Sequence, residues 1–396
     1  MIKFDFDKYC YGCKNCENIC PKNAIKVRKN NEGFFMPEID ESKCIECGMC
    51  EKICPYLNFK KQEEKLEEKE WYSSYLINEK ERINSTSGGI FPVLADEILK
   101  EDGIVCACTW NCNMQAIHIV GKNKQDINKM KKSKYVQSDM NNVVKILKEK
   151  VKKQKILFVG TPCQVAAVKL YLNNEDNLYT CGLICEGVPS NKVWDKYVEY
   201  LQNKYKGKIL EADFRCKDKL GWQTPEAKYV FDNKKIRRTL SFNYDLYVAG
   251  FLEGLYYRKS CNNCQYKGNG HNADVIIGDL WGADKQKLEK TNNKGISVLI
   301  VNTNKGKTLK NKIEKYINME KIEPQKVIPF NKLLMESIKE HNRRNEFFDN
   351  LEKENICKNI KRNIRKKKIL KNNIKQVIYK IGLYKKLKEI KNNGRG

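Results

Sequence analysis

The sequence predicts a small α+β unit over residues 1–60, followed by an α/β domain with a mostly mixed sheet. Two cysteine-rich segments of identical spacing fill the first sixty residues and form an internal repeat. Further along, an apolar strand at 155–160 precedes a helical pattern at 165–172 and a second apolar run at 178–185. This β-α-β order is typical of α/β domains. With 396 residues, 41% of them hydrophobic, the chain is long enough for two or three domains.

Both cysteine-rich segments read C-x2-C-x2-C-x3-C-P. Bacterial ferredoxins that carry two [4Fe-4S] clusters have this spacing, and the fourth cysteine of each run binds the cluster of the other run. The first sixty residues therefore resemble a two-cluster ferredoxin domain. The spacing predicts Cys10, Cys13, Cys16 and Cys54 as ligands of cluster I, and Cys44, Cys47, Cys50 and Cys20 as ligands of cluster II.

A disulfide framework and zinc sites are the alternatives for these cysteines. The N-terminal segment MIKFDFDKYC lacks the layout of a signal peptide, and no apolar run reaches the ~18 residues of a membrane span. We therefore expect a cytoplasmic protein, in which disulfides are rare. Zinc usually takes two C-x2-C pairs rather than triplets with a remote fourth ligand. Iron–sulfur clusters are the interpretation that we adopt.

The remaining elements follow from periodicity and from turn residues. A charged segment, 61–70, predicts a linker or an exposed helix. The small residues of Asn84 to Gly89 stand before a helical pattern and predict a helix start, which can be an ordinary cap or a phosphate site. We expect strands at 71–77, 104–110, 115–121, around Phe214, at 273–278 and at 296–301, and helices at 90–99, 141–153, 193–201 and 243–258.

Four further cysteines stand at strand ends and loops of the α/β domain. Cys163 follows the strand 155–160, where open α/β sheets place their ligands. Cys185 ends the next strand, and Cys261 and Cys264 form a C-x2-C pair. From the residues alone, a further [4Fe-4S] cluster, a zinc ion and a catalytic dithiol remain open. The other cysteines of this region, Cys106, Cys108, Cys112 and Cys181, fit small strand or buried residues.

A set of motifs decides between these alternatives. GTPCQVAAV, LICEGVPS, CNNC and ADVIIGDLWG occur here in order, after STSGGIF and SKYVQS. Together they resemble the beta subunit of coenzyme F420 hydrogenase/dehydrogenase, a family that includes plant hydroxymethyl chlorophyll reductase. The resemblance covers about residues 70 to 305. It implies family N- and C-terminal domains over 71–154 and 155–345. The cysteine spacing and the composition place a ferredoxin domain over 1–60, a linker over 61–70 and a basic tail over 346–396.

The resemblance also implies cofactors and residues. It implies FAD beside a third [4Fe-4S] cluster, whose ligands would be Cys163, Cys185, Cys261 and Cys264. The sequence contains no G-x-G-x-x-G fingerprint, so the flavin would not sit on a Rossmann motif. None of the three histidines, His118, His271 and His341, lies in a motif. The flavin site would involve Ser87, Gly88, Gly89, Lys134, Tyr135, Thr161 and Asp279.

We therefore expect an oxidoreductase that passes electrons between [4Fe-4S] clusters, FAD and an organic hydride substrate. A redox partner such as ferredoxin and a small-molecule or lipid-linked acceptor are the expected partners. The alternative is a non-catalytic, polyferredoxin-like electron-transfer subunit without flavin.

About half of the net charge of +27 lies in the last forty-two residues, which contain fifteen Lys or Arg and one acid, Glu389. Apolar residues recur there at near-helical intervals from Ile360 onward. A basic amphipathic helix of this kind can bind an anionic membrane surface. A solvated helix or an acidic protein partner are the alternatives. The sequence has no stacking or groove-reading motif for nucleic acid, so we do not expect nucleic-acid binding.

Overall fold

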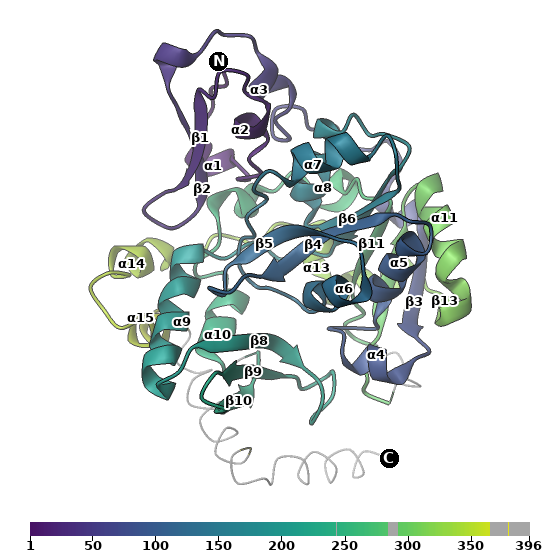
Figure 1. The fold of residues 1–396 in the computed structure, drawn as a ribbon. Helices are drawn as coiled ribbons and strands as arrows, with labels where there is room; N and C mark the ends of the chain where they lie inside the picture. Colours follow the sequence, from purple (N-terminus) through teal and green to yellow (C-terminus); the bar gives the residue numbers. More distant parts are fainter. Residues whose placement is uncertain (243, 284–291, 365–378, 380–396) are drawn as a thin grey trace.

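The computed structural model describes residues 1–242, 244–283, 292–364 and 379, and shows a small lobe above a larger core domain (Figure 1). The small lobe holds the cysteine-rich repeat. Its strands β1 and β2 form an antiparallel hairpin that reaches down beside the core. The elements of this lobe are α1 (Phe6–Tyr9), α2 (Asn15–Ile19), β1 (Ile25–Lys29), β2 (Phe35–Ile39), η1 (Glu41–Lys43) and α3 (Met49–Lys52).

The core domain is built on one eight-stranded mixed sheet of order β13-β3-β12-β11-β7-β6-β4-β5. Four consecutive strands, β11, β7, β6 and β4, run parallel, and all other neighbours are antiparallel. The predicted mixed α/β architecture is confirmed. The strands are β3 (Glu70–Leu76), β4 (Ile104–Trp110), β5 (Ala116–Gly121), β6 (Ile156–Gly160), β7 (Leu178–Leu183), β11 (Val275–Asp279), β12 (Ser297–Val301) and β13 (Ile317–Lys321).

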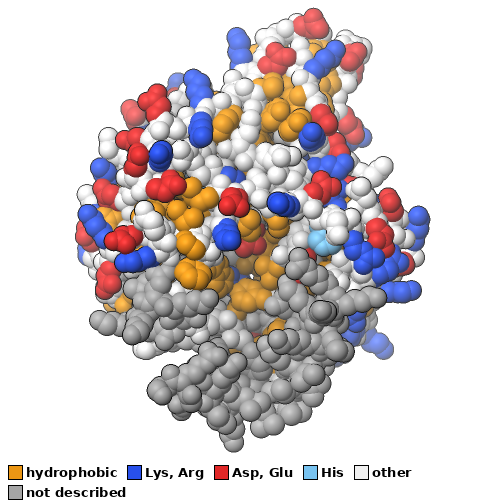
Figure 2. Space-filling model, turned by 180° about the vertical axis from the view of Figure 1, so that it is seen from behind, with side chains coloured by type: hydrophobic (Ala, Val, Ile, Leu, Met, Phe, Trp, Pro, Cys, Tyr) orange, Lys and Arg blue, Asp and Glu red, His pale blue; other side chains and the backbone are white. Residues whose placement is uncertain are grey.

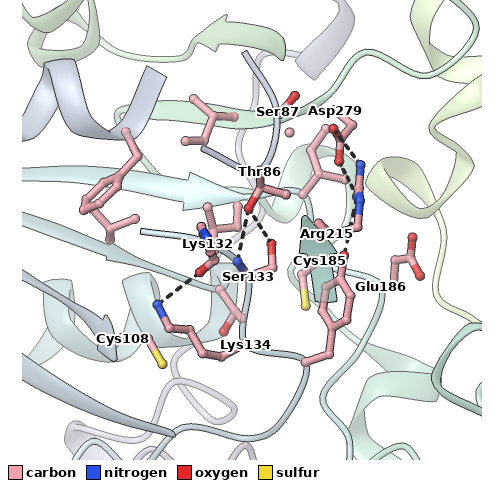
Figure 3. Close-up of a pocket in the computed structure, with 18 of the residues that line it drawn as sticks. Thr86, Ser87, Cys108, Lys132, Ser133, Lys134, Cys185, Glu186, Arg215 and Asp279 are labelled. Atoms are coloured by element: carbon pink, nitrogen blue, oxygen red, sulfur yellow. Dashed lines mark hydrogen bonds and ion pairs between the residues drawn. The ribbon is translucent and has the colours of Figure 1, made fainter. Parts of the chain in front are cut away.

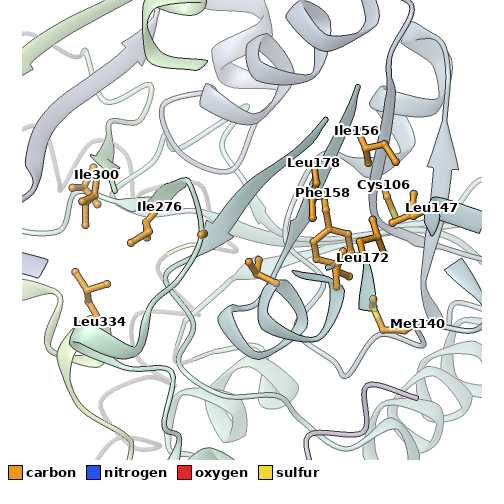
Figure 4. Packing of buried hydrophobic residues seen from close by; sticks show 14 of the residues in the cluster. Cys106, Met140, Leu147, Ile156, Phe158, Leu172, Leu178, Ile276, Ile300 and Leu334 are labelled. Carbon is orange, nitrogen blue, oxygen red and sulfur yellow. The ribbon is translucent and has the colours of Figure 1, made fainter. Parts of the chain in front are cut away.

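Helices cover both faces of this sheet because its central strands are apolar on both sides. In β6, Ile156 and Phe158 point to one face and Leu157 and Val159 to the other. The first face packs on α7 (Val143–Lys150) and α8 (Pro162–Tyr171), as Figure 4 shows for Phe158 and its neighbours. The second face packs on α5 (Ile90–Leu99), α6 (Lys124–Met130) and α11 (Asn304–Ile313).

A second apolar cluster lies between a three-stranded sheet and four helices. The sheet has the order β10-β9-β8, with β8 (Ile209–Cys216), β9 (Glu226–Phe231) and β10 (Ile236–Leu240). It packs with α9 (Asn191–Tyr205), α10 (Leu246–Leu252), α14 (Arg344–Asp349) and α15 (Ile356–Asn363). The remaining short elements are η2 (Leu66–Glu68), α4 (Glu79–Ile83), η3 (Lys259–Asn263), η4 (Gly268–Gly270), η5 (Glu314–Tyr316), α12 (Pro324–Val327), η6 (Ile328–Phe330) and α13 (Lys332–Met335).

Three features differ from the sequence-based expectation. The helix expected at 243–258 is shorter, since α10 ends at Leu252 and Gly254 then adopts a left-handed φ of 71°. The strands of 71–154 and of 155–345 share one sheet, so no structural break separates them. The expected tail from 346 begins later, because α14 and α15 pack in the second cluster and Ile360 is fully buried.

The apolar positions that the sequence predicts beyond Ile364, at Leu370, Ile374, Val377, Ile381, Tyr384 and Leu387, lie outside the described residues. Within the described residues, no helix is both long and apolar enough to cross a membrane.

The N-terminal lobe is fixed to the core largely through backbone carbonyls. The buried Asn15 Nδ2 donates to the carbonyl of Ala167 in α8 at 2.8 Å. Gln62, in the expected linker, donates to the carbonyl of His271 at 3.0 Å. At the far end of the lobe, the Glu32 carboxylate pairs with the buried guanidinium of Arg344 in α14. The two parts therefore touch at several separate points, from α2 to the turn between β1 and β2.

Candidate functional site

Two small cavities in the N-terminal lobe are lined by the two predicted ligand sets. One is lined by all four predicted ligands of cluster I, including the distant Cys54. The other is lined by all four predicted ligands of cluster II, including Cys20 from the first run. The fold thus brings each fourth cysteine to the run from which it is remote in sequence, as cross-ligation requires. All eighteen cysteines are free thiols here, and their role as ligands stays a prediction.

The four central cysteines also converge, from three separate segments of the core. Cys163 stands in the first turn of α8, held there by Pro162 and by a capping box between Thr161 and Gln164. The pKa of Cys163 is raised to about 12, chiefly by burial and also by the nearby thiols of Cys264 and Cys185.

Cys261 and Cys264 complete this set. Burial raises the pKa of each thiol to about 12, and in both cases the thiol of Cys185 contributes. Four thiols that all feel one another in a buried space match the donor set of a [4Fe-4S] cluster or of zinc. Among the described residues, no group of three or more Cys, His, Asp or Glu side chains has the arrangement that holds a single metal ion.

Beside these thiols lies a large pocket of about 820 Å³, within the size range of cofactor sites (Figure 3). It opens at the carboxyl ends of β4, β6, β7 and β11, where an open parallel sheet binds ligands. Six of the seven predicted flavin residues line it: Ser87, Gly89, Lys134, Tyr135, Thr161 and Asp279.

Gly88 is the predicted flavin residue that does not line the pocket. Its N–H donates to the Ser297 hydroxyl at 2.9 Å, and a Cβ there would stand 2.5 Å from the Ser74 carbonyl oxygen. Gly88 thus lets the loop press against β3 and β12, which turns Ser87 and Gly89 toward the pocket. Glycine is needed here because only a residue without a Cβ lets the two backbones come this close.

Cys185 belongs to both parts of the site. It lines the large pocket, and its thiol interacts with those of Cys261 and Cys264. β7 ends at Leu183, so Cys185 lies in the loop after the strand rather than in it as expected. The Lys267 ammonium donates to the Cys185 carbonyl and holds this loop in place. A ligand in the pocket would therefore lie directly beside the central thiols.

The pocket wall carries a buried ion pair that the sequence did not reveal. Arg215, on β8, pairs with Asp279 at the end of β11, with Nη1 3.0 Å from Oδ2. Its guanidinium lies 5.0 Å from the ring centroids of Phe242 and Trp281, and its Nε has no partner among the described residues. Trp222 Nε1 donates to the other Asp279 oxygen at 2.5 Å. Asp279 is thus fixed by two donors at one end of the pocket.

Lys134 has a structural role as well as a pocket position. Its ammonium donates to four backbone carbonyls at the end of α6, those of Lys129, Met130, Lys131 and Lys132. Burial lowers the pKa of Lys134 to about 8. The side chain caps the helix, and cations at helix C-termini are stabilising. Lys134 therefore shapes the pocket floor rather than pointing a free charge into it.

His118, which lies in no sequence motif, lines the pocket, and its burial leads us to expect that stability depends on pH. Burial lowers the pKa of His118 to about 4, against about 6.5 in an unfolded chain. The unfolded protein therefore binds a proton first as pH falls, so the free energy of unfolding should decrease from about pH 6.5 toward pH 4. His118→Phe, which keeps the stacking on Phe158, should flatten this slope in anaerobic urea titrations at several pH values.

His271 serves as the internal control for this experiment. Burial lowers the pKa of His271 to about 3, so it acts in the same direction and remains in the variant. A His118→Phe protein whose stability falls with pH as steeply as that of the wild type would contradict the prediction.

Comparison with known proteins identifies both parts. Residues 9–58 match the family model of the 4Fe-4S dicluster domain. Residues 153–325 match the model for the C terminus of the coenzyme F420 hydrogenase/dehydrogenase beta subunit. Residues 153–325 therefore form the C-terminal domain of this beta subunit family, and an N-terminal dicluster domain precedes it. The predicted ferredoxin domain with two [4Fe-4S] clusters is confirmed, and the chain is an iron–sulfur oxidoreductase of the beta subunit type.

A solved structure is similar as well. It is a chain of the xenon-derivatised F420-reducing [NiFe] hydrogenase complex from Methanosarcina barkeri, with 19% identity and a TM-score of 0.45. The match covers 67% of the present chain and 88% of that chain. No curated protein matches the sequence.

Proposed function

We propose that this protein is an iron–sulfur flavoprotein that transfers electrons between its [4Fe-4S] clusters and an organic substrate that exchanges hydride. FAD would occupy the 820 Å³ pocket, and a third cluster would be held by Cys163, Cys185, Cys261 and Cys264. A flavin exchanges one or two electrons, which allows single-electron clusters to serve hydride chemistry. The supporting observation is Cys185, which lines the pocket and belongs to the central thiol set.

The residues of the pocket are suited to this task. Ser87 and Gly89, at the start of α5, and Ser133 present polar groups on one side. Arg215, Asp279 and Trp281 present charge and an aromatic face on the other. A flavin needs both, because it joins an apolar ring system to a charged diphosphate. The surrounding wall is predominantly apolar, which limits access of water to a reduced cofactor.

Cofactor analysis of anaerobically purified protein tests the proposal. We expect about twelve iron and twelve sulfide per chain, from three four-iron clusters, together with one non-covalent FAD. Cys16→Ser should damage one ferredoxin cluster and leave the central cluster intact. Protein with two clusters, zinc at Cys261 and Cys264, and no flavin would refute the proposal and indicate an electron carrier without a flavin site.

A further inference from the structure

We propose that a small one-electron carrier protein docks on the rim of cluster II, and that electrons pass from there through cluster I to the central thiol site. The rim is defined by Ile45, Cys47 and Met49. This order of centres rests on the proposed function for its last step, the transfer to the central site. We derive this order of electron transfer from the positions of the two cavities: the core covers the cavity of cluster I, whereas the cavity of cluster II is open to solvent.

Cluster I faces the core through Tyr266. This side chain is 2% exposed, and its pKa is raised by burial and by thiols of both sets, Cys163 and Cys264 of the central set and Cys13 and Cys54 of cluster I. Its hydroxyl donates to the carbonyl of Pro55 at 2.6 Å, which fixes the ring between the two groups of thiols. One buried side chain thus lies between the two sites, hydrogen-bonded to Pro55 next to Cys54 and placed two residues after Cys264 in the chain.

Two further residues close the same boundary. Tyr11 packs edge-on against Tyr266, with centroids 5.5 Å apart, and its hydroxyl donates to Gln265 Oε1 at 3.1 Å. The buried Arg258 donates to the carbonyls of Cys10 and Phe35, so it binds the cluster I loop and the hairpin together. Core residues therefore cover cluster I, which leaves no room for an external protein to reach it from this side.

The cavity of cluster II lies on the side of the lobe away from Tyr266 and is open to solvent. Cys47 is exposed, whereas the other eleven predicted ligands, all among the described residues, are partly or fully buried. Ile45 and Met49, which line the same cavity, are 57% and 39% exposed. The lobe exposes hydrophobic side chains among Lys, Arg, Asp and Glu in Figure 2. An apolar centre with a charged surround is the usual anatomy of a protein interface.

The size of the rim indicates the kind of occupant. Two exposed apolar side chains around one thiol suit a small, transient contact, the class to which electron-transfer encounters belong. A permanent subunit or a second copy of this chain would need a larger apolar area. The carrier must also bring its own redox centre close to Cys47, so it must expose that centre. A small ferredoxin with [4Fe-4S] clusters meets these conditions.

The test compares Ile45→Glu and Met49→Glu with Leu210→Glu, which places the same charge on an exposed leucine of β8. Bleaching of cluster absorbance is followed by anaerobic stopped flow, with a reduced two-cluster ferredoxin or with dithionite as donor. We expect both rim variants to react about tenfold more slowly with ferredoxin, because interface substitutions change association rates by about one to three decades. Dithionite rates and iron content should not change, and Leu210→Glu should match the wild type.

The other outcomes would contradict the proposal that ferredoxin docks on the rim. Rim variants that ferredoxin reduces at the wild-type rate would overturn the assignment. A wild-type dimer that Ile45→Glu dissociates, seen by sedimentation, would show that a second copy occupies the rim instead. The readout is cluster bleaching and needs no flavin, so a protein without flavin would refute the proposed function and leave this test unaffected.

Discussion

Cys163→Ser is expected to abolish the reduction of bound flavin by reduced ferredoxin while both ferredoxin clusters remain. The thiols of Cys264 and Cys185 interact electrostatically with that of Cys163, and the buried Tyr266 hydrogen-bonds to Pro55, next to the cluster I cysteine Cys54. Loss of the central cluster would interrupt the path between cluster I and the pocket. The iron content should fall by about a third, since one of three four-iron clusters is lost. Stopped-flow spectra at flavin and cluster wavelengths separate the two steps.

Cys112→Ser is the matched control, because Cys112 is an exposed cysteine far from any predicted ligand set in sequence. It should retain full iron content and wild-type kinetics. Cys163→Ser protein with stoichiometric flavin that is still reduced at the wild-type rate would reject the proposed electron path.

Asp279→Ala is expected to produce a large loss of stability. It would leave the Arg215 guanidinium, whose side chain is 3% exposed, without its carboxylate partner. Removing one member of a buried ion pair costs about 3–5 kcal/mol, because a desolvated charge remains uncompensated. The free energy of unfolding, from anaerobic urea titration, should fall by this amount. Replacing both residues, as Arg215→Met with Asp279→Leu, should restore much of the loss.

The control for this effect is Glu38→Ala in the N-terminal hairpin. Glu38 pairs with Arg28, and both side chains are more than half exposed. Exposed pairs contribute about 0–1 kcal/mol, so little change is expected. An Asp279→Ala protein as stable as Glu38→Ala would mean that water or another group compensates Arg215.

The local sequence predicted those parts of the site that a short spacing determines. The C-x2-C-x2-C-x3-C-P repeats specify which cysteines share a cavity, because one run alone cannot surround a cube of iron and sulfur. The β-α-β pattern likewise places Cys163 at the carboxyl end of β6. In both cases the residues that determine the position of the cysteine lie within about ten residues of it, or within a sequence repeat of known geometry.

The far wall of the pocket was not predictable in this way. Arg215, Phe242 and Trp281 come from separate segments and meet only through tertiary packing. Arg215 stands in a strand without any motif, and nothing in its sequence neighbours distinguishes it from a surface arginine. Gly88 shows the opposite kind of error. It belongs to a motif and was predicted to line the pocket, but it allows the loop to pack closely against β3 and β12.

Helical periodicity also did not show what covers the apolar side chains near Ile360, which only the packing in the structure shows. Ile360 and Ile364 share a spacing with apolar residues further along, so the sequence placed them in a free tail. In the structure both are buried against α9 and α10, as part of the second apolar cluster. An amphipathic pattern shows that a helix has an apolar face, and it does not show whether protein or lipid covers that face.

The attachment of the N-terminal lobe through backbone carbonyls has a kinetic consequence. Asn15, Gln62 and Arg258 all donate to main-chain oxygens across the boundary, and Glu32 anchors the far end. An N-terminal lobe held in this manner does not move between an electron donor and an electron acceptor. Transfer between lobe and core would thus be insensitive to protein concentration, viscosity and salt. Only the collision at the rim would respond to them, so glycerol and ionic strength should slow one step of the sequence and spare the next.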